Sequence, residues 1–432
     1  MQQRRVNFHT LGCKLNFSES STLAREFEEG GFVRVAPDAE ADICVVNSCS
    51  VTEHADKKCR NLIRKLHRRN PGAIIAVTGC YAQLKPQEIA AIEGVDIVVG
   101  NNDKGDLYKR VLELPGKGRA QVYSCDADSL TSFFAAFSSG DRTRAFLKVQ
   151  DGCDYKCAYC TIHYARGGSR NMPVADLVAE AERIAAGGRR EIVLTGINTG
   201  DFGKTTGERF VDLLRALDGV RGIDRYRISS IEPNLLSDEV IAFTAASEKF
   251  QPHFHIPIQS GCDRILGLMR RRYNTTKFAE RIGAVRRAMP DAFLGIDVIV
   301  GFPGETDDDF ARTYDFLERI EPAFLHVFPY SVRPGTPAAD LPGRVPAPVI
   351  ERRAAALGEL CDRLHRAFCR SYDGRTASVL WESTRRDGRM FGYSENYIKV
   401  RAPFDRNRVN TISSVVLRAS DDGAAMDATF LA

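Results

Sequence analysis

Residues 152–160 read GCDYKCAYC and contain three cysteines in one short loop. Cys153, Cys157 and Cys160 are separated by three and then by two residues. Four-iron clusters are held by cysteine thiolates, and four thiolates are the usual number. A compact trio therefore indicates a cluster with one iron that has no protein ligand.

These three cysteines have two alternative uses. His163 could complete a Cys3His zinc site, although structural zinc sites favour other spacings. Disulfides are disfavoured because the first residues run straight into a strand without an apolar signal segment, which also predicts a cytoplasmic protein. The spacing and Tyr159 resemble the radical S-adenosylmethionine (SAM) superfamily. That resemblance implies that SAM binds the open iron and that the backbone of Tyr159 meets its adenine.

A second set of cysteines ends three strand-like runs near the start of the chain. The runs VNFHTLGC, DICVVNSC and AIIAVTGC end at Cys13, Cys49 and Cys80. Ligands of open α/β sheets lie beyond the carboxyl ends of parallel strands, so we expect these cysteines to converge in a Rossmann-like domain. Three cysteines again suggest a cluster with one open iron.

Buried free cysteines are common in cytosolic sheets, and scattered core thiols are the alternative for this second set. We expect the remaining cysteines to be of that kind: Cys44, Cys59, Cys125, Cys262, Cys361 and Cys369.

The middle of the chain alternates strand-like and helix-like segments, which predicts a partial (β/α)6 barrel of the TIM type. The six expected strands are 145–150, 191–196, 225–230, 253–258, 295–300 and 324–329. The cysteine loop follows the first of them directly. Because barrel chemistry occurs at the carboxyl ends of the strands, the loop should lie at the mouth.

Small or polar residues follow the same strand ends, and their shared location makes them candidate cofactor-binding residues. They are Thr195, Gly196 and Asn198, Ser230 and Glu232, Gln259 and Gly261, and residues 301–306. Of these, Gly196, Asn198, Ser230 and Glu232 are the predicted SAM contacts. The Glu232 carboxylate could hold a ribose hydroxyl or an amine. His255 and Asp297 lie within strands, where hydrogen bonding in the barrel lining explains them equally well.

The charge of the chain is small but unevenly distributed. The 432 residues carry a net charge of +4, yet residues 57–69 contain seven Lys and Arg and no acid. Such a helical face can neutralise phosphates or can simply be solvated, and the run 270–272 leaves the same choice. No apolar stretch has the length of a membrane span, so no membrane partner is expected.

The carboxyl-terminal part changes character after Thr336. A proline-rich stretch precedes a helix expected over residues 349–372, and the last sixty residues alternate like strands of a small β-barrel. Such a barrel could bind RNA with Tyr393, Tyr397 and nearby Arg and Lys, or could dock another protein. The expected domains are residues 1–120, 140–370 and 371–432.

Several motifs together resemble the methylthiotransferases. They are LGCKLN (11–16), NSCSVT (47–52), TGCYA (78–82), the cysteine loop, HIPIQSG (255–261) and DVIVGFPGET (297–306). The resemblance implies an amino-terminal cluster domain, a radical SAM barrel and a TRAM β-barrel. LGCKLN and TGCYAQ are most similar to the enzymes that modify N6-threonylcarbamoyladenosine in tRNA.

The resemblance implies two 4Fe-4S clusters, on Cys153, Cys157 and Cys160 and on Cys13, Cys49 and Cys80. Reductive cleavage of SAM at the first cluster would give a radical that takes hydrogen from carbon 2 of the adenine at position 37. The second cluster would carry the sulfur, and a second SAM the methyl group. Arg166 matches an arginine common in the family and is a candidate contact to cofactor or substrate. The implied partners are tRNA, a low-potential donor such as flavodoxin or ferredoxin, and a sulfur source.

Other functions remain open at this point. The substrate could be isopentenyladenosine in tRNA or an aspartate of a ribosomal protein. In a different class, an RNA-binding protein could use both clusters only as redox sensors, which predicts no turnover of SAM.

Overall fold

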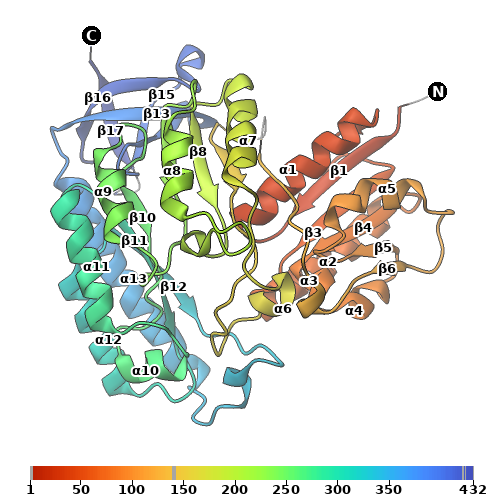
Figure 1. Cartoon of the computed structure of the whole chain (residues 1–432), viewed down its shortest axis with the longest axis horizontal. Helices are drawn as coiled ribbons and strands as arrows, with labels where there is room; N and C mark the ends of the chain where they lie inside the picture. The colour runs from red at the N-terminus through yellow and green to blue at the C-terminus, as the bar shows by residue number, and fades with distance from the viewer. Residues whose placement is uncertain (1–2, 139–142, 421–422, 424, 432) are drawn as a thin grey trace.

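A computed structural model describes residues 3–138, 143–420, 423 and 425–431 of the chain. It contains an amino-terminal sheet, a partial barrel and a carboxyl-terminal β-barrel, which Figure 1 colours red to orange, yellow to teal and blue. The expected start of the middle domain, residue 140, lies outside the described residues.

The amino-terminal sheet is entirely parallel, as in a Rossmann-like fold. Its strands, in spatial order, are β2 (Val33–Arg34), β1 (Arg5–Thr10), β3 (Ile43–Ser48), β4 (Ile74–Gly79), β5 (Val95–Val99) and β6 (Gln121–Tyr123). Its helices are α1 (Lys14–Glu29), α2 (Glu53–Arg69), α3 (Cys80–Leu84), α4 (Pro86–Ala90) and α5 (Leu107–Leu112).

Alternate residues of the central strands pack into two separate cores. Cys44 and Val46 of β3 face the side covered by α2, α3 and α4, whereas Ile43 and Val45 face α1 and α5. Strands buried on both faces read as continuous apolar runs, which is why these segments could be recognised in the sequence.

The partial barrel contains the six expected strands. They are β7 (Ala145–Lys148), β8 (Glu191–Thr195), β9 (Arg225–Ile228), β10 (His253–His255), β11 (Phe293–Val300) and β12 (Phe324–Pro329). Its helices are α6 (Ile162–Arg166), α7 (Val174–Ala186), α8 (Phe210–Asp218), α9 (Asp238–Ala246), α10 (Asp263–Leu268), α11 (Thr275–Ala288) and α12 (Asp307–Ile320). The strands form two parallel sheets of three, β7-β8-β9 and β10-β11-β12. A hydrogen bond from Ile231 N to His255 O (3.0 Å) joins the segments that follow β9 and β10.

Helix α13 (Ala347–Arg370) leads into a closed five-stranded barrel built around the fully buried Trp381. Its strands are β13 (Thr376–Arg386), β14 (Arg389–Ser394), β15 (Lys399–Pro403), β16 (Ile412–Arg418) and β17 (Met426–Phe430). The expected mixed α/β architecture is thus confirmed.

The carboxyl-terminal barrel docks on the amino-terminal ends of the partial-barrel strands, away from the cysteine loop. Arg225 and Arg227 of β9 donate to Ser378 O and Ser394 O, each at 2.7 Å. Arg227 also pairs with the fully buried Glu191 at the start of β8 (2.8 Å). Buried charges of this kind are tolerated only when paired, so this interface is tightly specified.

Two tyrosines expected to stack on RNA are used in that interface instead. The rings of Tyr393 and Tyr397 stack on each other with centroids 4.8 Å apart, and the Tyr397 ring lies 4.3 Å from that of His253. Arg144 donates to the Tyr397 hydroxyl (3.1 Å). Because both rings already have partners within the fold, neither presents a free face to a base in this structure.

Candidate functional site

Cys13, Cys49 and Cys80 follow the carboxyl ends of the adjacent parallel strands β1, β3 and β4. Gly12 has φ +99°, and a Cβ added there would lie 2.9 Å from Cys49 Sγ. The loop after β1 therefore passes directly over Cys49, and only glycine fits at that point. The structure brings these sequence-predicted cysteines to one sheet edge.

The loop with Cys153, Cys157 and Cys160 is clamped to the segment that follows α6. Cys153 N donates to Gly167 O (3.0 Å), and Asp151 N donates to Arg170 O (2.9 Å). Gly152 has φ +70°, and an added Cβ would lie 1.9 Å from Gly168 O. This close backbone contact fixes the start of the loop.

Each sulfur of the loop accepts a hydrogen bond from a nearby donor. Tyr155 N and Ile162 N donate to Cys153 Sγ and Cys160 Sγ, each at 3.4 Å. Arg271 Nη1 donates to Cys157 Sγ at 2.9 Å. Hydrogen bonds to sulfur stabilise thiolates and tune the reduction potential of clusters, so these donors suit an iron–sulfur group.

Four cysteines of the two sets lie in surroundings that disfavour free thiolates. Burial is the main cause of the raised pKa of Cys13 and Cys157, and it raises the pKa of Cys49 and of Cys160 to about 12. Free thiols at these positions are protonated at neutral pH. Thiolates form there when a metal group replaces the protons.

Neither set is spaced for a single zinc ion. Zinc–sulfur bonds of about 2.3 Å in a tetrahedron hold sulfur atoms about 3.8 Å apart. Among the described residues, the one set of metal-type ligand atoms within 4.8 Å of one another is that of His255, Asp297 and His326, which contains no cysteine. The wider spacing of the cysteines fits a larger group such as a four-iron cluster.

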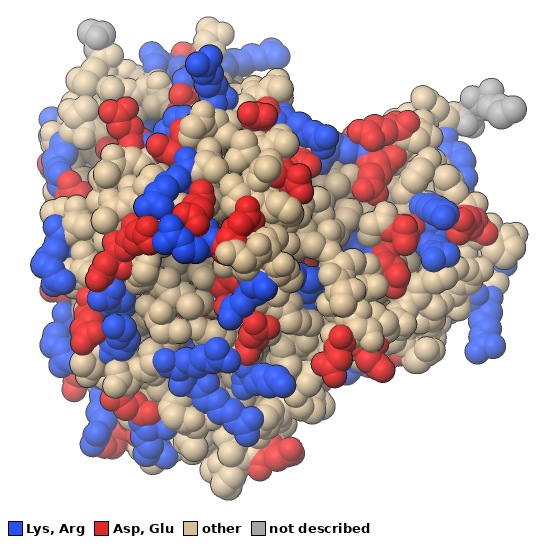
Figure 2. All heavy atoms as spheres, in the orientation of Figure 1, with Lys and Arg blue, Asp and Glu red and all other residues tan. Residues whose placement is uncertain are grey.

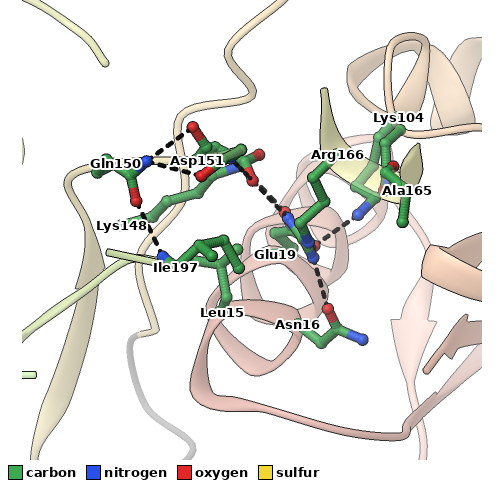
Figure 3. A network of polar contacts seen from close by, with 12 residues as sticks. Leu15, Asn16, Glu19, Lys104, Lys148, Gln150, Asp151, Ala165, Arg166 and Ile197 are labelled. Atoms are coloured by element: carbon green, nitrogen blue, oxygen red, sulfur yellow. Dashed lines mark hydrogen bonds and ion pairs between the residues drawn. The ribbon is translucent and has the colours of Figure 1, made fainter. Parts of the chain in front are cut away.

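Arg166 connects the two cysteine sets. It ends α6, just after the cysteine loop, and α6 packs against α3, which begins at Cys80. Arg166 donates to Glu19 Oε1 (3.0 Å), Asp151 Oδ1 (2.9 Å) and Asn16 Oδ1 (2.7 Å), as Figure 3 shows. These contacts join α1 of the amino-terminal sheet to the end of β7. They support a positioning role, and the predicted contact of Arg166 to cofactor or substrate stays a prediction.

The network around Arg166 carries an excess of buried positive charge. Its buried members are the cations Lys104, Lys148, Arg166 and Arg170 and the carboxylates Glu19 and Asp151. Burial alone would raise the pKa of Glu19, but Arg166 and the two lysines hold it well below its usual value. Uncompensated buried charge is costly. An anionic thiolate-bound cluster beside Cys13 and Cys80 would balance this charge.

Arg271 is the functional residue that the sequence analysis missed. It belongs to the basic run 270–272, but its side chain is only 2% exposed, while Arg270 and Arg272 are exposed. Arg271 pairs with Glu232 and donates to Cys157 Sγ and to the Tyr159 hydroxyl (3.3 Å). It therefore links two predicted cofactor contacts to the cysteine loop. Its one sequence signal was its place in that basic run, which gave no indication of burial.

The other predicted cofactor contacts lie at the strand ends, as expected from their spacing. Gly196 follows β8, where an added Cβ would lie 2.9 Å from Gln150 Oε1. Asn198 Oδ1 accepts from Glu232 N (3.3 Å), and Asn198 Nδ2 is buried without a hydrogen-bond partner among the described residues. Ser230 O accepts from Thr199 N (3.0 Å). A buried side-chain amide with an unpaired donor fits a polar cofactor such as SAM, and direct contact stays a prediction.

His255 and Asp297 lie on the neighbouring strands β10 and β11 and are bonded to each other, with Nε2 and Oδ1 2.6 Å apart. His326 of β12 completes a polar group on three adjacent strands. The bond between His255 and Asp297 agrees with the alternative explanation of these two residues, in which they form hydrogen bonds in the barrel lining.

The six cysteines predicted to be structural differ in burial. Cys44, Cys59, Cys262 and Cys361 are buried, and Cys125 and Cys369 are half-buried. All six are free thiols.

Two family models match the chain in the order of its parts. Residues 5–100 match the model described as "Uncharacterized protein family UPF0004", and residues 147–317 match the radical SAM superfamily. A radical SAM methyltransferase, TsrM from Kitasatospora setae, has a similar fold with a TM-score of 0.56 and 15% identity, covering 78% of this chain and 75% of that one. The fold and the cysteine loop define a radical SAM enzyme.

Curated relatives narrow that class. The chain is 41% identical to the threonylcarbamoyladenosine tRNA methylthiotransferase MtaB of Bacillus subtilis, covering 91% of this chain and 89% of the relative. It is 37% identical to MtaB of Thermotoga maritima (97% and 95% covered) and 37% identical to the tRNA-2-methylthio-N(6)-dimethylallyladenosine synthase of Sphingopyxis alaskensis (90% and 89% covered). The chain belongs to the radical SAM tRNA methylthiotransferases.

Membership of this family settles the cofactors and the reaction class. The enzyme uses SAM and two 4Fe-4S clusters, acts on tRNA and needs a reductant. The alternative of an RNA-binding redox sensor without turnover is therefore wrong. No helix in the described part of the chain is long and apolar enough to cross a membrane.

Proposed function

We propose that this enzyme methylthiolates carbon 2 of N6-threonylcarbamoyladenosine at position 37 of tRNA, giving 2-methylthio-N6-threonylcarbamoyladenosine. The relatives named above include enzymes for this nucleoside and for dimethylallyladenosine, so the choice depends on the chemistry of the N6 substituent. The threonyl group carries a carboxylate, whereas the dimethylallyl group is an uncharged hydrocarbon.

The position of Lys14 supports the threonylcarbamoyl nucleoside over the dimethylallyl nucleoside. It directly follows Cys13 and is exposed, and it forms no hydrogen bond or ion pair within the described residues. Burial is the main cause of the lowered pKa of His326, and the positive charge of Lys14 contributes to it. Lys14 is therefore an unpaired cation whose charge acts on His326 of β12. Such a cation suits a carboxylate and gains nothing from a dimethylallyl group.

The residues around the cysteine loop have distinct parts in this proposal. Cys153, Cys157 and Cys160 would hold one cluster and Cys13, Cys49 and Cys80 the other, while Tyr159, Gly196, Asn198, Ser230 and Glu232 would contact SAM. With SAM, the clusters supply radical C–H cleavage and sulfur insertion, which acid–base groups cannot perform. Arg271 would hold Glu232 beside the cysteine loop, and Arg166 would hold the cysteine sets in register.

The carboxyl-terminal barrel is proposed to be a TRAM domain, within domain limits of 1–120, 140–370 and 371–432. The proposed electron donor is a flavodoxin or ferredoxin, and a separate sulfur source restores the second cluster. The proposed location of the reaction is the cytoplasm, in keeping with a tRNA substrate.

The proposal is tested by nucleoside mass spectrometry of bulk tRNA from cells that lack the gene and from cells with the gene restored. We expect loss and recovery of 2-methylthio-N6-threonylcarbamoyladenosine, with the unmethylthiolated precursor accumulating in the deletion strain. Loss of the isopentenyl product instead, or an unchanged tRNA profile with loss of a methylthio-aspartate in a ribosomal protein, would refute it.

The roles of the cysteine sets are separated by two substitutions. Cys157→Ala should abolish SAM cleavage, measured as 5′-deoxyadenosine formed under reduction. Cys49→Ala should leave part of that cleavage and stop sulfur insertion, while Cys44→Ala, in a structural strand thiol, should keep both activities. Methylthiolated product from the Cys49→Ala enzyme would contradict the sulfur-donor role.

A further inference from the structure

An exposed apolar patch lies where the amino-terminal sheet meets the partial barrel. Arg333, in the segment after β12, donates to Ser50 Oγ (2.7 Å) and to Asp56 Oδ2 (2.9 Å). Glu53 N donates to Ser331 Oγ (3.5 Å). These contacts bring the segments of Val51 and Val332 together although the two residues are far apart in the sequence.

The apolar side chains at this junction are not covered. Val51 is 55% exposed, Val332 is 37% exposed, and Phe328 at the end of β12 is 49% exposed. Only seven large apolar side chains are exposed in the described part of the chain, and three of them lie within three residues of these contacts along the chain. Single exposed apolar residues need no explanation, but a group at a junction marks a binding surface.

Helix α2 begins at this junction and presents a basic face to solvent. Lys57, Lys58, Arg64, Lys65 and Arg68 are exposed and share one side of the helix. The opposite side, with Cys59, Ile63 and Leu66, is buried in the core of the sheet. The basic face extends about 17 Å along the helix, because an α-helix rises about 1.5 Å per residue.

These five cations have no acidic partners. Within the described residues, none of them forms an ion pair or a side-chain hydrogen bond, whereas Arg209, Arg215 and Arg312 on helices of the partial barrel all pair with acids. Figure 2 shows this mixing of opposite charges over α8 and α9. Like charges one turn apart on a helix repel each other at a cost of a few tenths of a kcal/mol per pair. An anionic partner would therefore offset the repulsion between the exposed cations of α2.

We propose that the basic face of α2 and the patch of Val51, Phe328 and Val332 form the docking surface for the looped strand of the RNA substrate. Phosphates lie along the helix, and unstacked bases rest on the apolar patch. The inference depends on the proposed function only in that the substrate is RNA.

Two features favour RNA over an acidic protein at this surface. Single-stranded RNA combines a regularly spaced anionic backbone with base faces that stack on aromatic and apolar side chains, and the surface offers both complements side by side. The surface also begins next to Cys49, since α2 starts four residues after it. A strand lying on α2 therefore leads toward the edge of the sheet where the cysteines lie.

The test uses the cluster-loaded enzyme and an RNA hairpin that carries the anticodon stem and loop. The substitutions Lys57→Gln, Arg64→Gln, Lys65→Gln and Arg68→Gln are combined in one variant. Each phosphate contact to a single strand contributes about 0.7 to the slope of log Kd against log salt concentration, so the slope should fall by about 3. Phe328→Ser should instead weaken binding at least about fivefold with an unchanged slope, because a lost base–aromatic contact costs about 1 kcal/mol or more.

Two matched variants act as controls. Removing four exposed but ion-paired charges with Arg183→Gln, Arg209→Gln, Arg215→Gln and Arg312→Gln changes the net charge equally and should leave the slope nearly intact. The charge-conserving combination Lys57→Arg, Arg64→Lys, Lys65→Arg and Arg68→Lys should bind RNA like the parent enzyme.

Three results would overturn the inference. One is an α2 variant with the parent slope and affinity, and another is an equal loss in the ion-paired control. The third is intact RNA binding with slowed reduction by an acidic flavoprotein, which would assign the surface to the reductant. A failure confined to the α2 variants leaves the proposed function standing, whereas a parent enzyme that binds no RNA overturns both.

Discussion

A single buried arginine connects the parts of the cofactor site at the residue scale. Arg271 is bonded to Glu232, to Cys157 Sγ and to the Tyr159 and Tyr273 hydroxyls. Its planar guanidinium presents several donors in fixed directions, which a lysine cannot reproduce. The geometry of the predicted cofactor contacts therefore depends on a residue outside the family motifs quoted above.

Replacing this arginine should impair SAM chemistry without removing the cysteines that hold iron. In Arg271→Gln the carboxylate of Glu232 loses its ionic partner, and breaking a buried ion pair costs about 3 to 5 kcal/mol. We expect 5′-deoxyadenosine formation to fall at least about tenfold, with iron bound to the enzyme. The exposed neighbour Arg270 provides the control, because its side chain forms no hydrogen bond or ion pair within the described residues, and Arg270→Gln should keep near-parental activity. Parental SAM cleavage in Arg271→Gln would contradict the role assigned to this residue.

A second residue-scale prediction concerns pH. Burial, and then Glu29, raises the pKa of Glu26 in α1 from 4.5 to about 7. A raised folded-state pKa means that the unfolded chain ionises first, so this group lowers stability as the pH rises from about 4.5 to about 7. Because Glu26 is only partly buried, screening reduces the effect to about 1 to 2 kcal/mol.

Removing that carboxylate should therefore stabilise the protein only above neutral pH. Glu26→Gln should raise the melting temperature at pH 8 and leave it nearly unchanged at pH 5, as followed by thermal unfolding in both buffers. Glu28→Gln, at an exposed position of the same helix, should show no such dependence on pH. Equal stabilisation of Glu26→Gln at both pH values would show that the carboxylate is not the cause.

At the scale of elements, the cysteine loop keeps its shape through backbone contacts with the segment after α6. Gly152 approaches Gly168 O so closely that no Cβ fits, and its positive φ disfavours other residues. Helix α6 continues the loop and carries Arg166 to the amino-terminal sheet. Loop and helix thus form one unit that relates the two cysteine sets.

Gly152→Ala should displace this loop and release the cluster that it holds. Iron analysis after reconstitution should show about half the iron of the parent enzyme, because the second set of three cysteines is untouched. Gly188→Ala is the matched control, since Gly188 also has a positive φ (+76°) but open space around an added Cβ. It should cost about 1 to 2 kcal/mol of stability and no iron. Full iron content in Gly152→Ala would argue against the clamped loop.

At the scale of the whole molecule, the mouth of the partial barrel is held against the amino-terminal sheet by two buried ionic contacts. One is the Arg166 network, and the other is the pair of Arg333 and Asp56, with exposures of 4% and 1%. The carboxyl-terminal barrel lies at the opposite ends of the strands. In the proposed function, radical formation and sulfur insertion therefore depend on different parts of the chain that these contacts hold together.

Weakening the contact between Arg333 and Asp56 should uncouple SAM cleavage from methylthiolation of the RNA. Arg333→Gln leaves Asp56 with the Ser50 hydroxyl as its remaining partner within the described residues, while the cysteine loop keeps all its contacts. We expect 5′-deoxyadenosine to form at near-parental rate and methylthiolated RNA per 5′-deoxyadenosine to fall at least about fivefold. The exposed Arg344→Gln is the control, with an unchanged ratio. A proportional loss of both products in Arg333→Gln would argue against uncoupling.

The sequence by itself determined the two cysteine trios, the parallel strands that precede them and the order of the three parts. These features are local, because cysteine spacing, apolar runs and turn residues can be recognised in short stretches of the sequence. The tertiary structure decided which polar residues meet. Arg271 belongs to a basic run in the sequence, but the fold buries its side chain beside Cys157. Tyr397 packs against Arg227 of β9 and His253 of β10, and Tyr393 stacks on Tyr397. Burial and pairing between distant segments arise only when the chain packs, so no local pattern could reveal them.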